Sequence, residues 1–127
     1  MNLKGRMIAK GSASGPVLRC DVPVGFFGHL DPETGVYREA GHPLDGLCVR
    51  GAVLVFPRAK GSTVGSYVLY ALGKTGRAPA AMVLRECDTI TAVGAIIGEI
   101  PAADQIDIGQ LVDGAFVKVE GGSVRSV

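Results

Sequence analysis

The sequence predicts an α/β domain that is rich in β-strands and has two central helices. Residues 52–56 and 80–84 are short, continuous apolar runs of strand length, which is typical of parallel strands covered on both faces. The first run is followed by a segment in which apolar residues recur with helical spacing, and the second by a segment rich in small residues that is expected to form a second helix. Two strand-to-helix units in succession favour a layered α/β arrangement with a partly parallel sheet.

The N-terminal half is predicted to consist of strands and loops. Residues 2–9 are expected to form one edge strand and residues 16–19 a second short strand, with a turn cluster at residues 11–15 between them. Glycine and proline punctuate residues 26–43, so this segment is expected to be a long structured loop with a tight turn at residues 31–35.

The second half is predicted to be more regular. The first helix is expected over residues 62–72, with Gly73 as its C-cap, and the second over residues 89–97. Residues 115–120 and 123–127 are expected to pair as a hairpin across the two glycines between them.

Length and composition predict one globular domain over residues 1–127. The chain is 47% hydrophobic and 20% charged, and its formal net charge is +1. A near-neutral chain has no basic excess to neutralise phosphates, so neither nucleic acid nor a membrane surface is expected as a partner. The N-terminus has no apolar signal-peptide core, and no stretch approaches the ~20 apolar residues of a membrane span. We therefore expect a cytoplasmic location.

Cysteine and histidine positions argue against a metal site within this chain. Cys20, Cys48 and Cys87 are far apart and odd in number, which disfavours a disulfide framework. His29 and His42 have no spacing typical of metal ligands. We expect this chain to bind no metal or other cofactor.

The segment Lys60-Gly61-Ser62-Thr63 is the strongest candidate for chemistry. It stands between a predicted strand and a predicted helix, where free backbone N–H groups and the helix dipole favour an anion. Gly61 allows close backbone approach, and Arg58 and Lys60 add positive charge. The alternative is that Ser62 or Thr63 only caps the helix and that the cations are solvated. The local sequence leaves both interpretations open.

Two other motifs carry less weight. Gly73-Lys74-Thr75 resembles part of a P-loop, but Val68 stands where that motif requires a glycine, and the motif follows a helix instead of a strand. His42, next to Pro43, closes the long loop and is a candidate substrate contact, although a lone histidine is more often structural or exposed than catalytic.

Three stretches, in their order and spacing, resemble a known family over roughly residues 10–105. They are "GFFGHLDPETGVYREAGHPLDG", "GAVLVFPRAKGSTVGS" and "GRAPAAMVLRECDTITAVGAIIGEIP". Together they look like the small, swivelling-domain subunit of the aconitase X group. Departures are His29, where glycine is common in the family, Lys60, where arginine is common, and Thr63, where a second serine is common.

The resemblance implies a swivelling β/β/α domain similar to the mobile C-terminal domain of aconitases. It also implies a two-subunit hydro-lyase whose large subunit carries an iron–sulfur cluster. Without that large subunit, this chain is expected to be inactive. The serine of the Gly-Ser loop, the proton acceptor in that family, corresponds to Ser62. Position alone places the other candidate substrate contacts, which are Gly61, Thr63, Lys60, Arg58 and His42.

The resemblance leaves two substrates open. Archaeal members point to dehydration of mevalonate 5-phosphate to trans-anhydromevalonate 5-phosphate in isoprenoid biosynthesis, and bacterial members to dehydration of cis-3-hydroxy-L-proline. Arg58 and Lys60 suit a phosphate and a carboxylate alike. We favour mevalonate 5-phosphate because the compact, separate small subunit resembles the archaeal form. A different class of function, a non-catalytic anion-binding or scaffolding module, also fits the residues.

Overall fold

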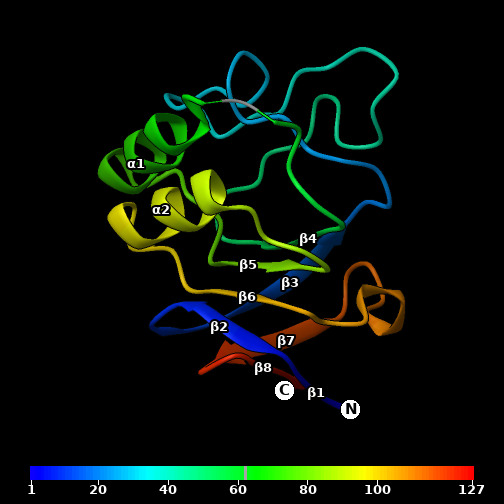
Figure 1. Cartoon of the computed structure of the whole chain (residues 1–127). Helices are drawn as coiled ribbons and strands as arrows, with labels where there is room; N and C mark the ends of the chain where they lie inside the picture. The colour runs from blue at the N-terminus through cyan, green and yellow to red at the C-terminus, as the bar shows by residue number, and fades with distance from the viewer. Residues whose placement is uncertain (62) are drawn as a thin grey trace.

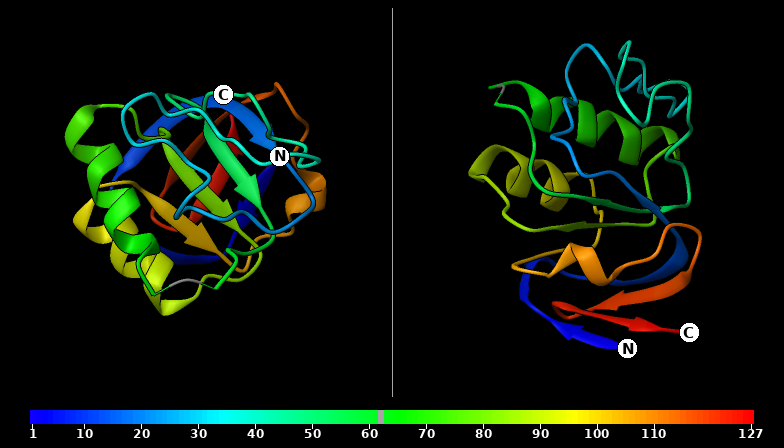
Figure 2. Two further views of the ribbon diagram at one scale, coloured as in Figure 1. Left: turned by 90° about the horizontal axis from the view of Figure 1, so that it is seen from above. Right: turned by 90° about the vertical axis from the view of Figure 1, so that its right-hand side faces the viewer.

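The computed structural model describes residues 1–61 and 63–127, and within them eight strands form one mixed sheet in the order β1-β8-β7-β3-β4-β5-β6-β2. The strands are β1 (Asn2–Lys4), β2 (Arg6–Ala9), β3 (Ser12–Arg19), β4 (Val53–Phe56), β5 (Ala81–Leu84), β6 (Ala102–Asp104), β7 (Phe116–Glu120) and β8 (Ser123–Ser126). The helices are α1 (Gly65–Thr75), α2 (Thr89–Ile97) and a short 3₁₀-helix at Ile108–Gln110. The two α-helices pack side by side above the sheet, and both termini lie at the opposite end of the molecule (Figure 1 and Figure 2).

The predicted class, a β-rich α/β fold with a partly parallel sheet and two central helices, is confirmed. Strands β3, β4, β5 and β6 run parallel to one another, and the other neighbouring pairs are antiparallel. Strand β3 belongs to both the parallel and the antiparallel part of the sheet. Its first half, residues 12–16, pairs antiparallel with β7, and its last three residues pair parallel with β4.

The parallel strands are buried on both faces, as their unbroken apolar sequences predict. In β4, Val53 and Val55 belong to one buried cluster, while Leu54 and Phe56 belong to the other. Strand β5 alternates in the same way. One cluster lies between the sheet and the helices, and the other lies inside the curl of the sheet. Both faces of the sheet are therefore fixed, and so is the point where β4 ends.

The prediction of one edge strand over residues 2–9 is wrong, because the chain breaks at Gly5 into two strands at opposite edges of the sheet. Only one residue separates these edges along the chain, so the sheet curls until they lie next to each other. The N–H of Gly5 donates to the carbonyl of Gly122 at 2.8 Å, which ties the junction to the β7–β8 hairpin. A Cβ at Gly5 would lie 2.1 Å from the carbonyl oxygen of Asp104, so only glycine fits there.

Other predicted boundaries also need correction. The turn cluster at residues 11–15 lies largely within β3, which begins at Ser12. Helix α1 begins at Gly65, with Val64 at the N-cap position, and ends at Thr75, where Gly76, with a φ of 72°, is the left-handed C-cap. Thr63 is therefore not the N-cap, and the proposed capping by Ser62 lies outside the described residues. The bounds of α2 are as predicted, and Asp88 caps it by accepting the Thr91 N–H at 3.1 Å.

Gly73, predicted as a C-cap, instead lies inside α1 where α1 crosses α2. A Cβ at this position would lie 2.3 Å from the carbonyl oxygen of Gly98, the residue that ends α2. The absence of a side chain lets the two helices approach at backbone distance. The glycine is thus explained by helix packing and not by helix termination.

We expect Gly73→Ala to destabilise the protein, although alanine favours helices by ~1 kcal/mol relative to glycine. The added methyl group must push α1 away from the backbone of α2, and overpacking of this kind costs ~1–3 kcal/mol. Denaturant unfolding of the variant measures the net change in free energy. Lys74→Ala, at the exposed neighbouring position, should change it by no more than ~0.5 kcal/mol. A Gly73→Ala variant more stable than the wild type would contradict this account of the crossing.

Candidate functional site

Two chain segments from distant parts of the sequence run side by side at the carboxyl end of β4. Val24 and Ala59 form a parallel bridge. The Val24 N–H donates to the Arg58 carbonyl at 3.1 Å, and the Lys60 N–H donates to the Val24 carbonyl at 2.9 Å. The segment that carries the candidate loop is therefore a continuation of the sheet. Ligand sites of parallel α/β sheets characteristically lie at this end of the strands.

A chain of polar contacts links the long loop to Lys60. The Tyr37 hydroxyl accepts the Gly25 N–H at 2.9 Å and donates to Glu39 Oε1 at 2.7 Å. Glu39 Oε2 in turn accepts from Lys60 Nζ in an ion pair. Tyr37 is completely buried, whereas the Lys60 side chain is 41% exposed and that of Glu39 22% exposed. The network thus runs from the core to the surface.

This network shifts the pKa values of Glu39 and Tyr37 in opposite directions. Lys60 and then the Tyr37 hydroxyl stabilise the Glu39 carboxylate and lower its pKa to about 2. Burial, reinforced by the bond to Glu39, raises the pKa of Tyr37. Glu39 is therefore an anion and Tyr37 a neutral hydrogen-bond donor at any pH near neutrality.

The structure brings only part of the predicted site together. Lys60 and Gly61 line a hollow of about 290 Å³, which we call the loop hollow; the other lining residues are Gly25, Phe26, Phe27 and His29. Among the described residues beyond its chain neighbours, no atom lies within 4 Å of a Cβ built on Gly61, so the backbone there is open to approach. Arg58 and Thr63 are exposed on the same loop, and Ser62 lies outside the described residues.

His42 lies in a neighbouring hollow of about 240 Å³, which Lys60 and Glu39 also line. Its Nε2 contacts the Pro23 carbonyl at 2.9 Å, and the Leu44 N–H donates to its Nδ1 at 3.0 Å. Because a carbonyl only accepts, Nε2 carries a proton and donates to Pro23, while Nδ1 accepts from Leu44. The ring packs on Tyr37 with centroids 4.7 Å apart. Both nitrogens are thus engaged in holding the loop, which makes His42 a supporting residue in this geometry.

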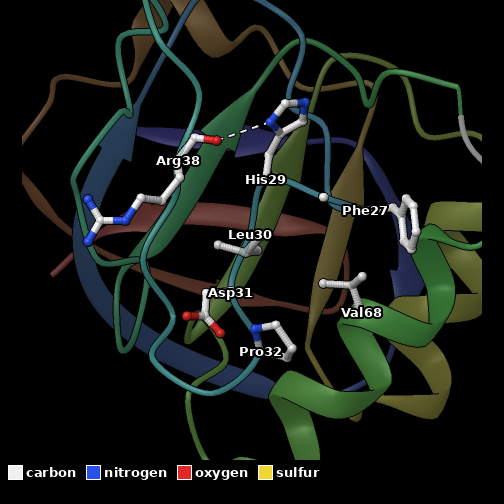
Figure 3. Close-up of a pocket in the computed structure, with 8 residues that line it drawn as sticks. Phe27, His29, Leu30, Asp31, Pro32, Arg38 and Val68 are labelled. Carbon is white, nitrogen blue, oxygen red and sulfur yellow. Dashed lines mark hydrogen bonds between the residues drawn. The ribbon is translucent and has the colours of Figure 1, made fainter.

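Sequence reasoning did not single out Tyr37 and Glu39, and it did not place His29 at the site. His29 borders both the loop hollow and a third hollow of about 370 Å³, which Figure 3 shows. Its Nδ1 contacts the Arg38 carbonyl at 3.0 Å, so Nδ1 carries a proton. The available sequence signal was the alternation of Tyr37 and Glu39, which places both side chains on one side of an extended segment.

The described residues do not assemble a metal centre. Among them, no group of three or more histidine, cysteine, aspartate and glutamate side chains is placed to hold a metal ion. Cys20 is buried, Cys48 is exposed, and burial with nearby carboxylates raises the pKa of Cys87 to about 12. Dispersed thiols, one of them held protonated, do not fit the thiolate set of an iron–sulfur cluster. In the same part of the chain, no helix is long and apolar enough to cross a membrane.

A curled mixed sheet, two helices on one side and a loop site at the end of the parallel strands define a swivel-type α/β domain. The family model described as the aconitase X swivel domain matches residues 2–126, and the chain belongs to this family. The predicted resemblance to the aconitase X group is thereby confirmed.

Curated relatives and solved structures agree with this assignment. The chain is 48% identical to the phosphomevalonate dehydratase small subunit of Thermococcus kodakarensis, over 97% of this chain and 92% of that protein. It is also 48% identical to the protein of the same name from Methanosarcina acetivorans, over 95% and 86%. The crystal structure of Thermococcus kodakaraensis aconitase X in its holo-form matches with a TM-score of 0.97 at 46% identity, covering 100% of this chain and 98% of that one. The solution structure of a UPF0107 protein matches at 0.89 and 37%, covering 100% and 99%.

We expect the Glu39–Lys60 ion pair to survive mild acid. Because the pKa of Glu39 is lowered from 4.5 to about 2, the pair stabilises the fold above pH 4.5, and this contribution is lost as the pH falls through about 2. An NMR titration of the Glu39 carboxyl carbon checks this value. Lys60→Met should raise the pKa of Glu39 towards its ordinary value, since Lys60 is the largest cause of the shift. Lys74→Met, on α1, should leave it unchanged, and equal titration curves for the wild type and Lys60→Met would contradict the pairing.

Proposed function

We propose that this chain is the small subunit of a two-subunit hydro-lyase that dehydrates mevalonate 5-phosphate to trans-anhydromevalonate 5-phosphate. The observation that carries the proposal is the set of curated relatives named phosphomevalonate dehydratase small subunit, about half identical over nearly the whole chain. A name that specifies a small subunit implies a large one, so we expect this chain to act only when assembled with that partner.

The task of this chain in the reaction is to place Ser62 as the proton acceptor. A serine hydroxyl is a weak base unless its surroundings stabilise the alkoxide. In sequence, Ser62 lies between Lys60 and the start of α1, whose eleven residues direct the positive end of a helix dipole at the preceding loop. Positive charge on Arg58 acts in the same direction. These features support a role for Ser62 in removing the α-proton of the substrate.

We assign substrate contacts to the loop around Ser62. Gly61 offers an open backbone beside the loop hollow, and Thr63 and Arg58 are exposed on either side of it. Arg58 suits the phosphate or the carboxylate of the substrate because a guanidinium forms paired hydrogen bonds with either group. Lys60 contributes less free charge than its position suggested, because Glu39 balances it.

The iron–sulfur cluster that the resemblance implies belongs, in this proposal, to the large subunit. The described cysteines of this chain do not converge on one point, so no step of the reaction is assigned to a cluster held here. The residues of this chain bind and orient the substrate and accept its proton.

We expect Ser62→Ala to lower kcat by at least ~10²-fold in the reconstituted two-subunit complex, the magnitude typical of a lost general base. The assay is dehydration of mevalonate 5-phosphate, measured as formation of the anhydro product. Ser126→Ala, in β8 at the far end of the molecule, is the matched control and should retain full activity. A Ser62→Ala complex with nearly wild-type turnover would remove the catalytic role of this serine.

The substrate is tested with the wild-type complex and two compounds in parallel. We expect turnover of mevalonate 5-phosphate and none of cis-3-hydroxy-L-proline. The reverse pattern would overturn the proposed substrate and identify a hydroxyproline dehydratase. An assembled, iron-loaded complex that dehydrates neither compound would instead favour the non-catalytic anion-binding or scaffolding module.

A further inference from the structure

Both ends of the loop that carries Ser62 rest on one short segment, residues 24–26. Val24 pairs through its backbone with residues 58 and 60 before the loop. After the loop, Gly65 is buried at the start of α1, and a Cβ built on it would lie 3.9 Å from both the Phe26 side chain and Ile90. The course of the chain where it enters and leaves this loop therefore depends on how firmly Lys60 and Gly65 are held against this segment.

Lys60 is held at its backbone and along its side chain. Its N–H donates to the Val24 carbonyl at 2.9 Å, and its Nζ is paired with Glu39. A Cβ built on Gly25 would lie 3.4 Å from Lys60 Cδ, so the lysine stem runs across the Gly25 backbone. These contacts fix the residue that immediately precedes Gly61 and Ser62.

Glu39 is itself fixed from the core. Its Oε1 accepts from the hydroxyl of Tyr37, whose ring is fully buried and packs on His42. The same hydroxyl accepts the Gly25 N–H, so Tyr37 ties Glu39 to the segment on which the loop rests. The carboxylate thus has one oxygen bound by a rigid, buried donor and the other by Lys60.

We propose that Tyr37, Glu39 and Lys60 form a positioning clamp that orients the Ser62 loop, and that Lys60 does not bind the substrate anion. Assigning the clamp to this reaction rests on the proposed function. Lys60 lines both the loop hollow and the hollow beside His42, and because Glu39 neutralises it there, the lysine charge is committed within the protein. Lys60 is thus a positioning residue whose loss displaces the loop instead of weakening substrate binding.

The two possible roles of Lys60 predict opposite effects of removing the Glu39 charge. Glu39→Gln keeps an oxygen that accepts from Tyr37 but loses the ion pair. If Lys60 positions the loop, Glu39→Gln and Lys60→Met both lower kcat and leave KM nearly unchanged. If Lys60 binds the substrate, Glu39→Gln frees it and lowers KM, whereas Lys60→Met raises KM. The KM–kcat split therefore separates positioning from binding.

The test measures kcat and KM for mevalonate 5-phosphate in the reconstituted complex with each variant. We expect each single substitution to lower kcat by about tenfold with KM within about twofold, since misplaced catalytic groups affect the chemical step. The double variant should be no slower than either single variant, because both remove the same interaction. Lys60→Arg, which keeps the pair, should recover most of the activity. Glu33→Gln, an exposed glutamate of the same long loop, is the matched control and should behave as wild type.

Hydrogen–deuterium exchange of the same complexes gives a readout that does not require turnover. Peptides covering residues 58–66 should exchange faster in Glu39→Gln and in Lys60→Met than in the wild type or Glu33→Gln. Lower KM in Glu39→Gln, additive losses in the double variant, or unchanged exchange would each overturn the clamp. If the wild-type complex does not dehydrate mevalonate 5-phosphate, the proposed function fails, and the exchange data alone then decide whether the clamp exists.

Discussion

The parallel pairing of Val24 with the segment that leaves β4 is the contact on which the candidate site depends. Strand β4 is buried on both faces, so its end cannot shift without disturbing two apolar clusters. Residues 58–60 continue from this fixed end and take their direction from hydrogen bonds to Val24. The long loop and helix α1 are then placed relative to one rigid strand, and the hollows beside Lys60 follow from that placement.

The parts of the fold that the sequence predicted well are those with a strong local pattern. Strands β4 and β5, helix α2 and the C-terminal hairpin are each marked by their own apolar period or turn residues. The errors lie where a distant partner decides the structure. Gly5 breaks a strand because the sheet curls and brings Asp104 against it, and Gly73 stays helical because α2 crosses there. Strand β6, only three residues long, owes its conformation to pairing with β2 and β5.

The residues of the candidate site also divide into those that a local pattern predicts and those that only the fold brings in. The segment around Gly61 was identifiable from its place between a strand and a helix. Glu39 was not, because 21 positions separate it from Lys60 in the chain and only the fold joins their side chains. That contact changes the interpretation of a predicted residue. A lysine beside a Gly-Ser loop suggests a side chain that binds an anionic ligand. Here Lys60 is instead paired with Glu39, whose carboxylate is itself held by Tyr37, so Lys60 is part of the protein scaffold.

A clamp on the loop also fits a chain that supplies only part of an active site. Arg58, Gly61 and Thr63 are exposed, and charges in contact with water stabilise developing charge weakly. Phe27, which lines the loop hollow, is 61% exposed, so a large apolar surface also faces solvent there. Covering this face with the large subunit would exclude water and strengthen each of these interactions. If the loop were free before assembly, ordering it on binding would make association with the large subunit less favourable. Because Lys60 is fixed within the small subunit, the start of the loop is ordered when the domain folds and not when the subunits associate.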